Sequence, residues 1–396
     1  MYIKGVNLGN WLVLEKWMSP TLFDGTTAED EYSLPRQLSP EVYEARIKIH
    51  RSEYITERDF ASIRRMGLNT VRIPVPYFIF GDRAPFIGCV RELDRAFVWA
   101  EKYGLKILID LHTAPLSQNG FDNGGISGVC KWSQTPEEVD FVLDVLEKLA
   151  RRYGRREGLF DITPINEPVT REMWDLMQVQ KRYPPADPDL AEGSGPNTME
   201  FLRDFYDRAY ERIRPHVLTD KYVVFHDAFQ LRSWKDFITQ PKFQQVMLDT
   251  HQYLMMAEAM GCEQTPEGYT AYIRENFAKG IAEVQAYVPV ICGEWCLFNS
   301  YAVGQDTRGG QSVLNGVEFS GGGMPEDEAR RVYRQLAEEQ LRAWRAGAGY
   351  FYWSYKLLLD VANEPQWTGW DCWDLEKCVD MGWFPVESCD RIGGGL

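Results

Sequence analysis

The segment Asp161-Ile-Thr-Pro-Ile-Asn-Glu-Pro168 joins a strand-like apolar run to two polar side chains, Asn166 and Glu167. A second segment, Val290-Ile-Cys-Gly-Glu-Trp295, has the same form and carries Glu294 near its end. Polar side chains thus stand at the carboxyl ends of two strand-like runs that lie far apart in the chain. When parallel strands close into a barrel, these ends meet on one face. The two segments therefore predict a barrel that brings Glu167 and Glu294 together.

The rest of the chain continues this alternation of strand-like and helix-like segments. Eight strands alternating with helices predict an α/β fold, a (β/α)₈ TIM barrel. An open, doubly wound sheet is the alternative, but no Gly-x-Gly-x-x-Gly motif follows an early strand. The expected strands are Ile3–Leu8, Thr70–Val75, Lys106–Leu111, Phe160–Ile165, Tyr222–His226, Val246–His251, Val288–Gly293 and Gly349–Trp353. The expected helices include Thr56–Met66, Arg91–Tyr103, Pro136–Tyr153, Met199–Ile213 and Glu326–Ala346.

No long linker, repeat or low-complexity segment divides the chain, so residues 1–396 are expected to form a single domain. Three intervals, Gly9–Glu53, Ala114–Gln134 and Thr170–Asn197, are longer than a strand-to-helix connection requires. The C-terminal segment Trp367–Trp383 is also polar and rich in tryptophan. Loops that follow barrel strands form the catalytic face. We expect these segments to wall a pocket there, with the C-terminal loops as an elaboration.

Charge and composition restrict the class of partner. The net charge of −15 and the lack of a basic patch argue against nucleic acid. No apolar run is long enough to cross a bilayer, so no membrane partner is expected. Met1 is followed at once by a strand-like run without a leader, which predicts a cytoplasmic protein. The sequence does not indicate an oligomeric state.

The eight cysteines have irregular spacings, and in a chain without a leader they are expected to be reduced thiols. Cys292 and Cys296 flank Glu294, but no second Cys or His pair at ligand spacing accompanies them. No metal site is therefore expected.

Polar and aromatic side chains recur at the carboxyl ends of six expected strands. Each one alone could be an ordinary buried partner in an ion pair or hydrogen bond. Together on one rim, two carboxylates indicate glycoside hydrolysis, in which one protonates the departing oxygen and the other acts at the anomeric carbon. This chemistry needs no cofactor. The strand-end residues are Arg72, His112, Asn166, Glu167, His251, Tyr253, Glu294 and Trp353.

Asn166-Glu167-Pro168 after the fourth strand, with Glu294-Trp295 after the seventh, resembles glycoside hydrolase family 5 of clan A. The resemblance spans Gly5 to Trp353. It implies retention of anomeric configuration, with Glu167 as general acid/base and Glu294 as nucleophile. It further implies that Asn166 binds the sugar 2-hydroxyl, that Tyr253 orients Glu294, and that Trp353 lies under the sugar in subsite −1. Supporting positions are implied for Arg72, His112 and His251.

Two longer motifs resemble the exo-β-1,3-glucanase branch of that family: Gly5-Val-Asn-Leu-Gly-Asn-Trp-Leu-Val-Leu-Glu15 and Asp110-Leu-His-Thr-Ala-Pro-Leu-Ser-Gln-Asn-Gly-Phe-Asp-Asn123. By this resemblance Glu15 and Asp122 hold the non-reducing sugar and close the pocket, and Phe121 stacks at the entrance to the aglycone site. The chain departs from the branch where Gly9-Asn10 replaces two glycines, in the segment Tyr183–Asn197, and in lacking an export signal.

These features predict an exo-acting retaining β-glycosidase whose partner is a small oligosaccharide. The unexported architecture favours a β-mannosidase that cleaves an imported mannosyl-β-1,4-N-acetylglucosamine unit, as in the intracellular bacterial β-mannosidases of the family. The alternatives are an exo-β-1,3-glucosidase or glucanase, a glycolipid glycosidase, and an inactive sugar-binding barrel. Mannose and glucose differ only in the orientation of the C2 hydroxyl, and Asn166 suits either sugar.

Overall fold

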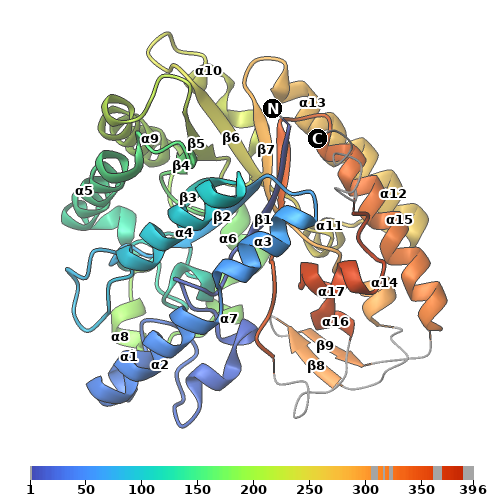
Figure 1. The fold of residues 1–396 in the computed structure, drawn as a ribbon, viewed down its shortest axis with the longest axis horizontal. Coiled ribbons are helices and arrows are strands. Elements are labelled where there is room, and N and C mark those ends of the chain that lie inside the picture. The colour runs from blue at the N-terminus through green and yellow to red at the C-terminus, as the bar shows by residue number, and fades with distance from the viewer. Residues whose placement is uncertain (1, 305–310, 315–316, 321–323, 360–367, 387–396) are drawn as a thin grey trace, which may run out of the picture.

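The computed structural model describes residues 2–304, 311–314, 317–320, 324–359 and 368–386. Eight parallel strands close into a barrel in the order β1-β10-β7-β6-β5-β4-β3-β2 (Figure 1). The prediction of a single-domain (β/α)₈ barrel is thereby confirmed. The strands are β1 (Ile3–Asn7), β2 (Thr70–Val75), β3 (Lys106–Leu111), β4 (Leu159–Thr163), β5 (Tyr222–His226), β6 (Val246–His251), β7 (Val290–Trp295) and β10 (Gly349–Tyr352).

Proline accounts for the two strands whose bounds were predicted least well. The strand β4 ends at Thr163 because Pro164 has no backbone N–H to donate. The strand β7 begins after Pro289 for the same reason, and it continues to Trp295, which pairs with Tyr352 of β10. Glu294 therefore lies within β7 rather than just beyond it.

Helices surround the barrel and bury their apolar faces against it (Figure 1). The five predicted helices are present within two residues at each end. They are α3 (Glu57–Arg65), α4 (Val90–Tyr103), α5 (Pro136–Tyr153), α9 (Met199–Ile213) and α15 (Glu326–Trp344). The other outer helices are α10 (Lys235–Ile238), α12 (Pro266–Tyr272) and α13 (Lys279–Gln285), with a π-helical stretch at Ile273–Ala278 between the last two.

The interval Gly9–Glu53 contains a helix that the sequence analysis missed, α2 (Pro40–Glu53). Ser39 caps it by accepting a hydrogen bond from the backbone N–H of Val42, and Pro40 occupies its first turn. The remaining α-helices and strands are short. They are α1 (Leu34–Gln37), α6 (Arg171–Met177), α7 (Val179–Arg182), α8 (Pro188–Ala191), α11 (Leu254–Ala259), α14 (Ser300–Val303), α16 (Thr368–Asp371), α17 (Leu375–Asp380) and the hairpin β8 (Gln311–Leu314) and β9 (Val317–Ser320).

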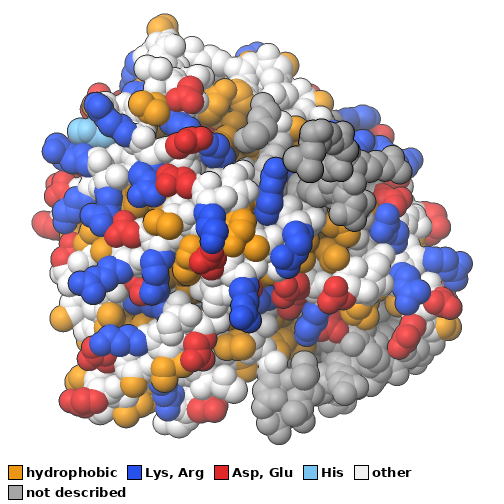
Figure 2. All heavy atoms as spheres, in the orientation of Figure 1, with side chains coloured by type: hydrophobic (Ala, Val, Ile, Leu, Met, Phe, Trp, Pro, Cys, Tyr) orange, Lys and Arg blue, Asp and Glu red, His pale blue; other side chains and the backbone are white. Residues whose placement is uncertain are grey.

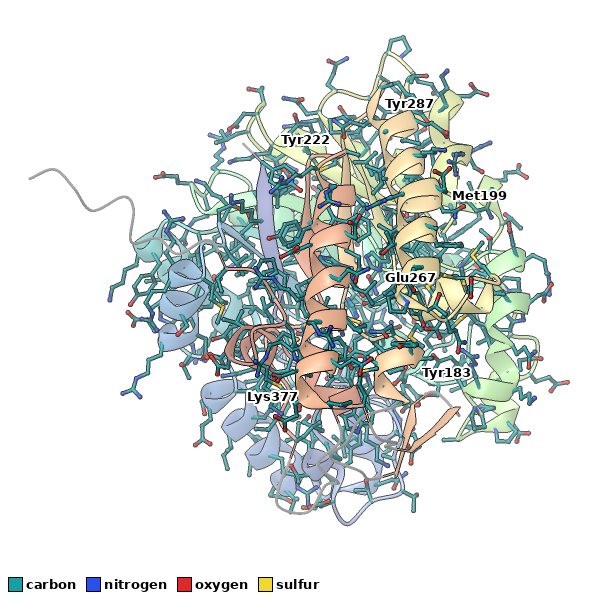
Figure 3. The ribbon with its side chains drawn as sticks, turned by 90° about the vertical axis from the view of Figure 1, so that its right-hand side faces the viewer. Tyr183, Met199, Tyr222, Glu267, Tyr287 and Lys377 are labelled. Carbon is teal, nitrogen blue, oxygen red and sulfur yellow. The ribbon has the colours of Figure 1, made fainter. Side chains whose placement is uncertain are left out.

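The elaborations gather at one end of the barrel. In Figure 1, α1, α7, α8, α16, α17 and the β8–β9 hairpin all lie at the lower end. Figure 3 places Tyr183 and Lys377 toward this end, and Tyr222, the first residue of β5, toward the opposite end. The elaborated end is therefore the one where the strands finish. Of the predicted C-terminal segment Trp367–Trp383, residue 367 lies outside the described residues.

Three further properties concern the surface charge, the apolar character of the helices and the state of the cysteines. Acidic and basic side chains are interspersed over the described part of the face in Figure 2. Among the described residues no helix has the length and apolar character needed to span a membrane. The described cysteines are all buried and free: Cys89, Cys130, Cys262, Cys292, Cys296, Cys372 and Cys378.

Candidate active site

The two glutamates that the sequence places on one rim meet around a single histidine. The Nδ1 atom of His251 lies 2.7 Å from Oε1 of Glu167 and 3.5 Å from Oε2 of Glu294. Those two oxygens therefore lie no farther apart than the sum of the two distances. One imidazole nitrogen that lies beside both carboxyl groups favours the roughly 5–5.5 Å separation of a retaining glycosidase over the roughly 6.5–9.5 Å of an inverting one. The arrangement matches direct attack by one carboxylate.

Glu294 is held through both of its carboxylate oxygens. Arg72 donates from Nη1 to Oε1 at 2.7 Å, and the Tyr253 hydroxyl donates to Oε2 at 2.8 Å. Burial raises the pKa of Glu294, and the positive charges of His251 and Arg72 oppose that rise. These donors fix the orientation of the carboxylate and favour its ionised form.

Glu167 has a different environment from that of Glu294. It follows β4 in the left-handed backbone region at φ 42°, a conformation that is costly for a residue with a side chain and that is concentrated at functional sites. Asn123 donates to its Oε2 at 2.8 Å. Burial would raise the pKa of Glu167, but the hydrogen bond and charge of His251 outweigh it and hold that pKa below its usual value. The pKa of His251 is itself raised, because Glu294 and Asp249 outweigh the effect of burial.

Arg72 connects the two carboxyl-bearing strands through the barrel interior. Its Nη2 lies 3.0 Å from Oδ1 of Asp110 and donates to Oδ1 of Asn166 at 2.7 Å. Its Nη1 also donates to Oδ1 of Asn7 at 2.9 Å. Burial disfavours the guanidinium charge, but Asp110 and Glu294 more than compensate and raise the pKa of Arg72. Arg72 therefore stays cationic and holds Asn166 and Glu294 in register.

Two buried aspartates support the histidines, and the sequence analysis did not single them out. Asp110 lies two residues before His112 in β3, with Oδ2 2.7 Å from His112 Nδ1. Asp249 lies two residues before His251 in β6, with Oδ2 3.6 Å from His251 Nε2. Residues two apart in a strand point to the same face, so the repeated Asp-x-His spacing is the signal that could have found them. Asn123 was part of a quoted motif, but its contact with Glu167 was not predicted.

Glu15 and Asp122, predicted to close the pocket, both line it; Glu15 is buried and Asp122 is half-buried. The indole of Trp17 donates to Oε2 of Glu15 at 2.9 Å. Burial, with the nearby Asp122 carboxyl, raises the pKa of Glu15 well above its usual value. Burial also raises the pKa of Asp122 to about 6. This end of the pocket therefore presents buried oxygen atoms suited to sugar hydroxyls.

Asn10, which replaces a glycine of the related branch, supports this end of the pocket. It adopts φ 59°, which asparagine tolerates better than most residues. Its Oδ1 accepts from the backbone N–H of Glu15 at 3.0 Å, and its Nδ2 donates to the Ser19 hydroxyl at 2.8 Å. The substitution therefore keeps the turn and anchors the loop that carries Glu15.

The two glutamates, with Glu15 and Asp122, line a cavity of about 360 Å³ at the carboxyl ends of the strands. Trp353 lines it, and its ring stacks on His112 with centroids 5.6 Å apart. Four predicted site residues, Arg72, His112, Asn166 and His251, are buried in the barrel but are not among the residues that line the cavity. The predicted residues that do line it are Glu15, Phe121, Asp122, Glu167, Tyr253, Glu294 and Trp353.

One group of side chains has the composition of a metal site. Potential ligand atoms of Glu167, His226 and His251 lie within 4.8 Å of one another. Nδ1 of His226 accepts a hydrogen bond from the backbone N–H of Ala228, and Nδ1 of His251 contacts Glu167. These contacts engage the Nδ1 atom of each histidine, whereas Nε2 of His226 has no hydrogen-bond partner, and the expectation of no metal stays a prediction.

Comparisons with known proteins agree with this geometry. Residues 40–315 match the family model described as cellulase (glycosyl hydrolase family 5). A probable glucan 1,3-beta-glucosidase A of Emericella nidulans is 32% identical over 412 residues, covering 98% of this chain and 91% of that protein. A glucan 1,3-beta-glucosidase of Schwanniomyces occidentalis is 30% identical over 421 residues, covering 98% and 88%.

Two solved structures share the fold. Rutinosidase from Aspergillus niger has a TM-score of 0.71 at 20% identity, over 97% of this chain and 98% of that one. Thermotoga maritima Cel5A, solved with mannotriose, has a TM-score of 0.53 at 14% identity, over 96% and 97%. The family match over more than half of the chain, together with relatives aligned along almost all of it, shows that this protein is a glycoside hydrolase of family 5.

Proposed function

We propose that the protein is an exo-acting, retaining β-glucosidase that removes terminal β-1,3-linked glucose from short glucans. The observation that carries this proposal is the pair Glu167 and Glu294, which meet around His251 in a pocket ended by the carboxyls of Glu15 and Asp122. The names of the relatives that align along nearly the whole chain support the glucosidase over the β-mannosidase that the sequence alone favoured. No named relative supports the mannosidase.

In the first step Glu294 attacks the anomeric carbon and the bond from that carbon to the glycosidic oxygen breaks. Glu167 protonates the departing oxygen. His251 supplies the proton that Glu167 needs, because transfer from Nδ1 to Oε1 across 2.7 Å leaves a protonated carboxyl beside a neutral imidazole. That imidazole keeps its second proton on Nε2, which faces Asp249. Arg72 and Tyr253 keep Glu294 ionised and aligned until it attacks.

In the second step Glu167 removes a proton from water, and the resulting hydroxide displaces Glu294 from the anomeric carbon. Two inversions at one carbon restore the β configuration of the released sugar. Asn123, which donates to Oε2 of Glu167, holds that carboxylate in place as it changes from acid to base. The geometry of the pair and the family membership support the roles proposed for Glu167 and Glu294.

The exo preference follows from the end of the pocket that holds Glu15 and Asp122. Glu15 is buried and Asp122 is half-buried, and Trp17 fixes Glu15 through its indole N–H. A further sugar on the non-reducing side would have to displace these groups. We therefore expect single glucose units to be released from the chain end.

A panel of β-linked disaccharides tests the proposal. Laminaribiose, cellobiose, gentiobiose and mannosyl-β-1,4-N-acetylglucosamine are incubated with the enzyme, and the first-formed anomer is identified by NMR. We expect laminaribiose to have the highest kcat/KM of the four and to release β-glucose first. A preference for the mannosyl substrate would restore the mannosidase assignment, and an α-anomer as first product would contradict the retaining mechanism. The cytoplasmic location stays a prediction that fractionation of the source cells would test.

A further inference from the structure

We propose that the leaving-group side of the cavity binds an apolar aglycone containing a ring, in preference to a second sugar. This inference rests on the proposed glucosidase function and specifies the substrate class of the same site. It comes from six side chains that line the cavity and belong to one apolar cluster, which we call the leaving-group wall: Phe121, Met173, Met177, Tyr183, Phe229 and Met256.

The position of the acid identifies the leaving-group side. Glu167 must reach the glycosidic oxygen, so the aglycone lies beside Glu167 and away from Glu15. Phe229 flanks this side, because its ring centroid is 6.5 Å from that of His251, the partner of Glu167. Phe121 and Tyr183 continue the wall, with ring centroids 5.2 Å apart.

The wall is assembled from segments far apart in the sequence. Phe121 follows β3, Phe229 follows β5, and Met256 lies in α11 after β6. Met173 and Met177 come from α6, four residues apart and therefore on one face of that helix. Tyr183 follows α7, and Figure 3 shows it at the elaborated end of the barrel. The loops after four barrel strands, β3, β4, β5 and β6, thus contribute apolar atoms to one surface.

Two polar groups that line the cavity near the wall, Glu258 and Asn123, are engaged elsewhere. Glu258 accepts from the backbone N–H and hydroxyl of Ser300 and from the Tyr269 hydroxyl. Asn123 donates to Glu167. A sugar at this position would bring several hydroxyls that need partners when they leave water, and unpaired hydroxyls reduce affinity.

Methionine suits an apolar ligand of variable shape. Its unbranched, polarisable thioether adapts to different surfaces and makes favourable contacts with aromatic rings. Three methionines and three aromatic rings surround the leaving group, which favours an aromatic or alicyclic aglycone over a linear polar one. Of the polar side chains that line this side, Arg182 contacts the Met177 sulfur at 3.9 Å and so remains close to the wall.

The test compares β-glucosides whose aglycones are alcohols of similar basicity, so that differences report binding rather than leaving-group chemistry. The substrates are methyl, n-hexyl and 2-phenylethyl β-glucoside, with laminaribiose as the sugar aglycone. We expect kcat/KM to rise at least about tenfold from methyl to 2-phenylethyl β-glucoside, because the ring buries apolar area that the methyl group lacks. We also expect the value for 2-phenylethyl β-glucoside to exceed that for laminaribiose.

Failure of this inference can be told from failure of the proposed function. If no β-glucoside is hydrolysed, the proposed function is wrong. If laminaribiose is cleaved well while methyl and 2-phenylethyl β-glucoside are cleaved equally, the function stands and the apolar aglycone site is refuted.

Variants of two nearby methionines assign the effect to the wall. Met256→Ser should lower the ratio of kcat/KM for 2-phenylethyl over methyl β-glucoside roughly fivefold, the loss expected for part of one apolar contact. Met256→Leu should restore most of the ratio. The control is Met260→Ser, at a position four residues away that is 62% exposed and does not line the cavity. An unchanged ratio in Met256→Ser would overturn the assignment.

Discussion

The hydroxyl of Tyr253 donates a hydrogen bond of 2.8 Å to Oε2 of Glu294. Because Arg72 holds Oε1 of the same carboxylate at 2.7 Å, both oxygens are fixed before substrate arrives. A hydrogen bond to the charged form of a carboxyl favours that form. We therefore propose that Tyr253 is a positioning residue that aligns Glu294, the proposed nucleophile, and helps to keep it ionised against the effect of burial.

Tyr253→Phe should lower kcat/KM about ten- to a hundredfold, the worth of one hydrogen bond to a charged group. It should also raise the pKa of Glu294, because the ionised form loses a donor. The acidic limb of the pH profile of kcat/KM, which reports ionisation of the nucleophile, should then move to higher pH. Tyr43→Phe serves as the control, since it removes a buried hydroxyl that does not line the cavity. An unmoved acidic limb would argue against this role of Tyr253.

Glu167→Ala should affect substrates according to their need for a proton. The kcat/KM for laminaribiose, whose leaving group is a poor one, should fall by roughly 10²–10⁴-fold, the usual contribution of general acid catalysis. The value for 2,4-dinitrophenyl β-glucoside should fall far less, because its leaving group departs without protonation. Glu172→Ala, at an exposed position in α6, provides the matched control. Equal losses on both substrates would mean that Glu167 is not the acid.

Asp122→Asn should stabilise the protein at pH 7 while lowering its activity. Burial raises the pKa of Asp122 to about 6, so the native state retains this proton after the unfolded state has lost it. The free energy of unfolding therefore declines as pH rises from about 4 to about 6. Above that range the full loss, up to about 3 kcal/mol, is present. The asparagine variant avoids this cost.

Urea denaturation at pH 7 and at pH 4 measures the effect, with Asp189→Asn as a control at an exposed position. The gain in the free energy of unfolding that Asp122→Asn gives should be largest at pH 7 and largely absent at pH 4. A gain that is independent of pH would contradict the buried-charge explanation.

The barrel was predictable because its strands are buried on both faces and so appear as continuous apolar runs. The ends of β4 and β7 were less predictable, since Pro164 and Pro289 decide them through a missing N–H. The helix α2 was missed despite its Ser39-Pro40 start. Two of its apolar residues, Val42 and Ile49, are 42% and 56% exposed, so its apolar spacing does not follow one buried face.

The site was predictable where polar residues interrupt apolar strands near their ends, as Glu167 and Glu294 do. The supporting Asp110 and Asp249 were missed because a single acidic residue does not distinguish a buried network from an isolated ion pair, and only the Asp-x-His spacing repeated in two strands does so. The leaving-group wall could not be predicted, because its apolar side chains come from four loops and converge only in the folded chain.

The proposed mechanism requires Glu294 to form a covalent bond with the sugar. Incubation with 2-deoxy-2-fluoro-β-glucosyl fluoride, followed by mass spectrometry of the intact protein and its peptides, tests it directly. We expect one fluoroglucosyl group per chain, located on Glu294, with none on a Glu294→Gln variant. A label on another residue, or steady turnover without any label and with α-anomeric product, would contradict it.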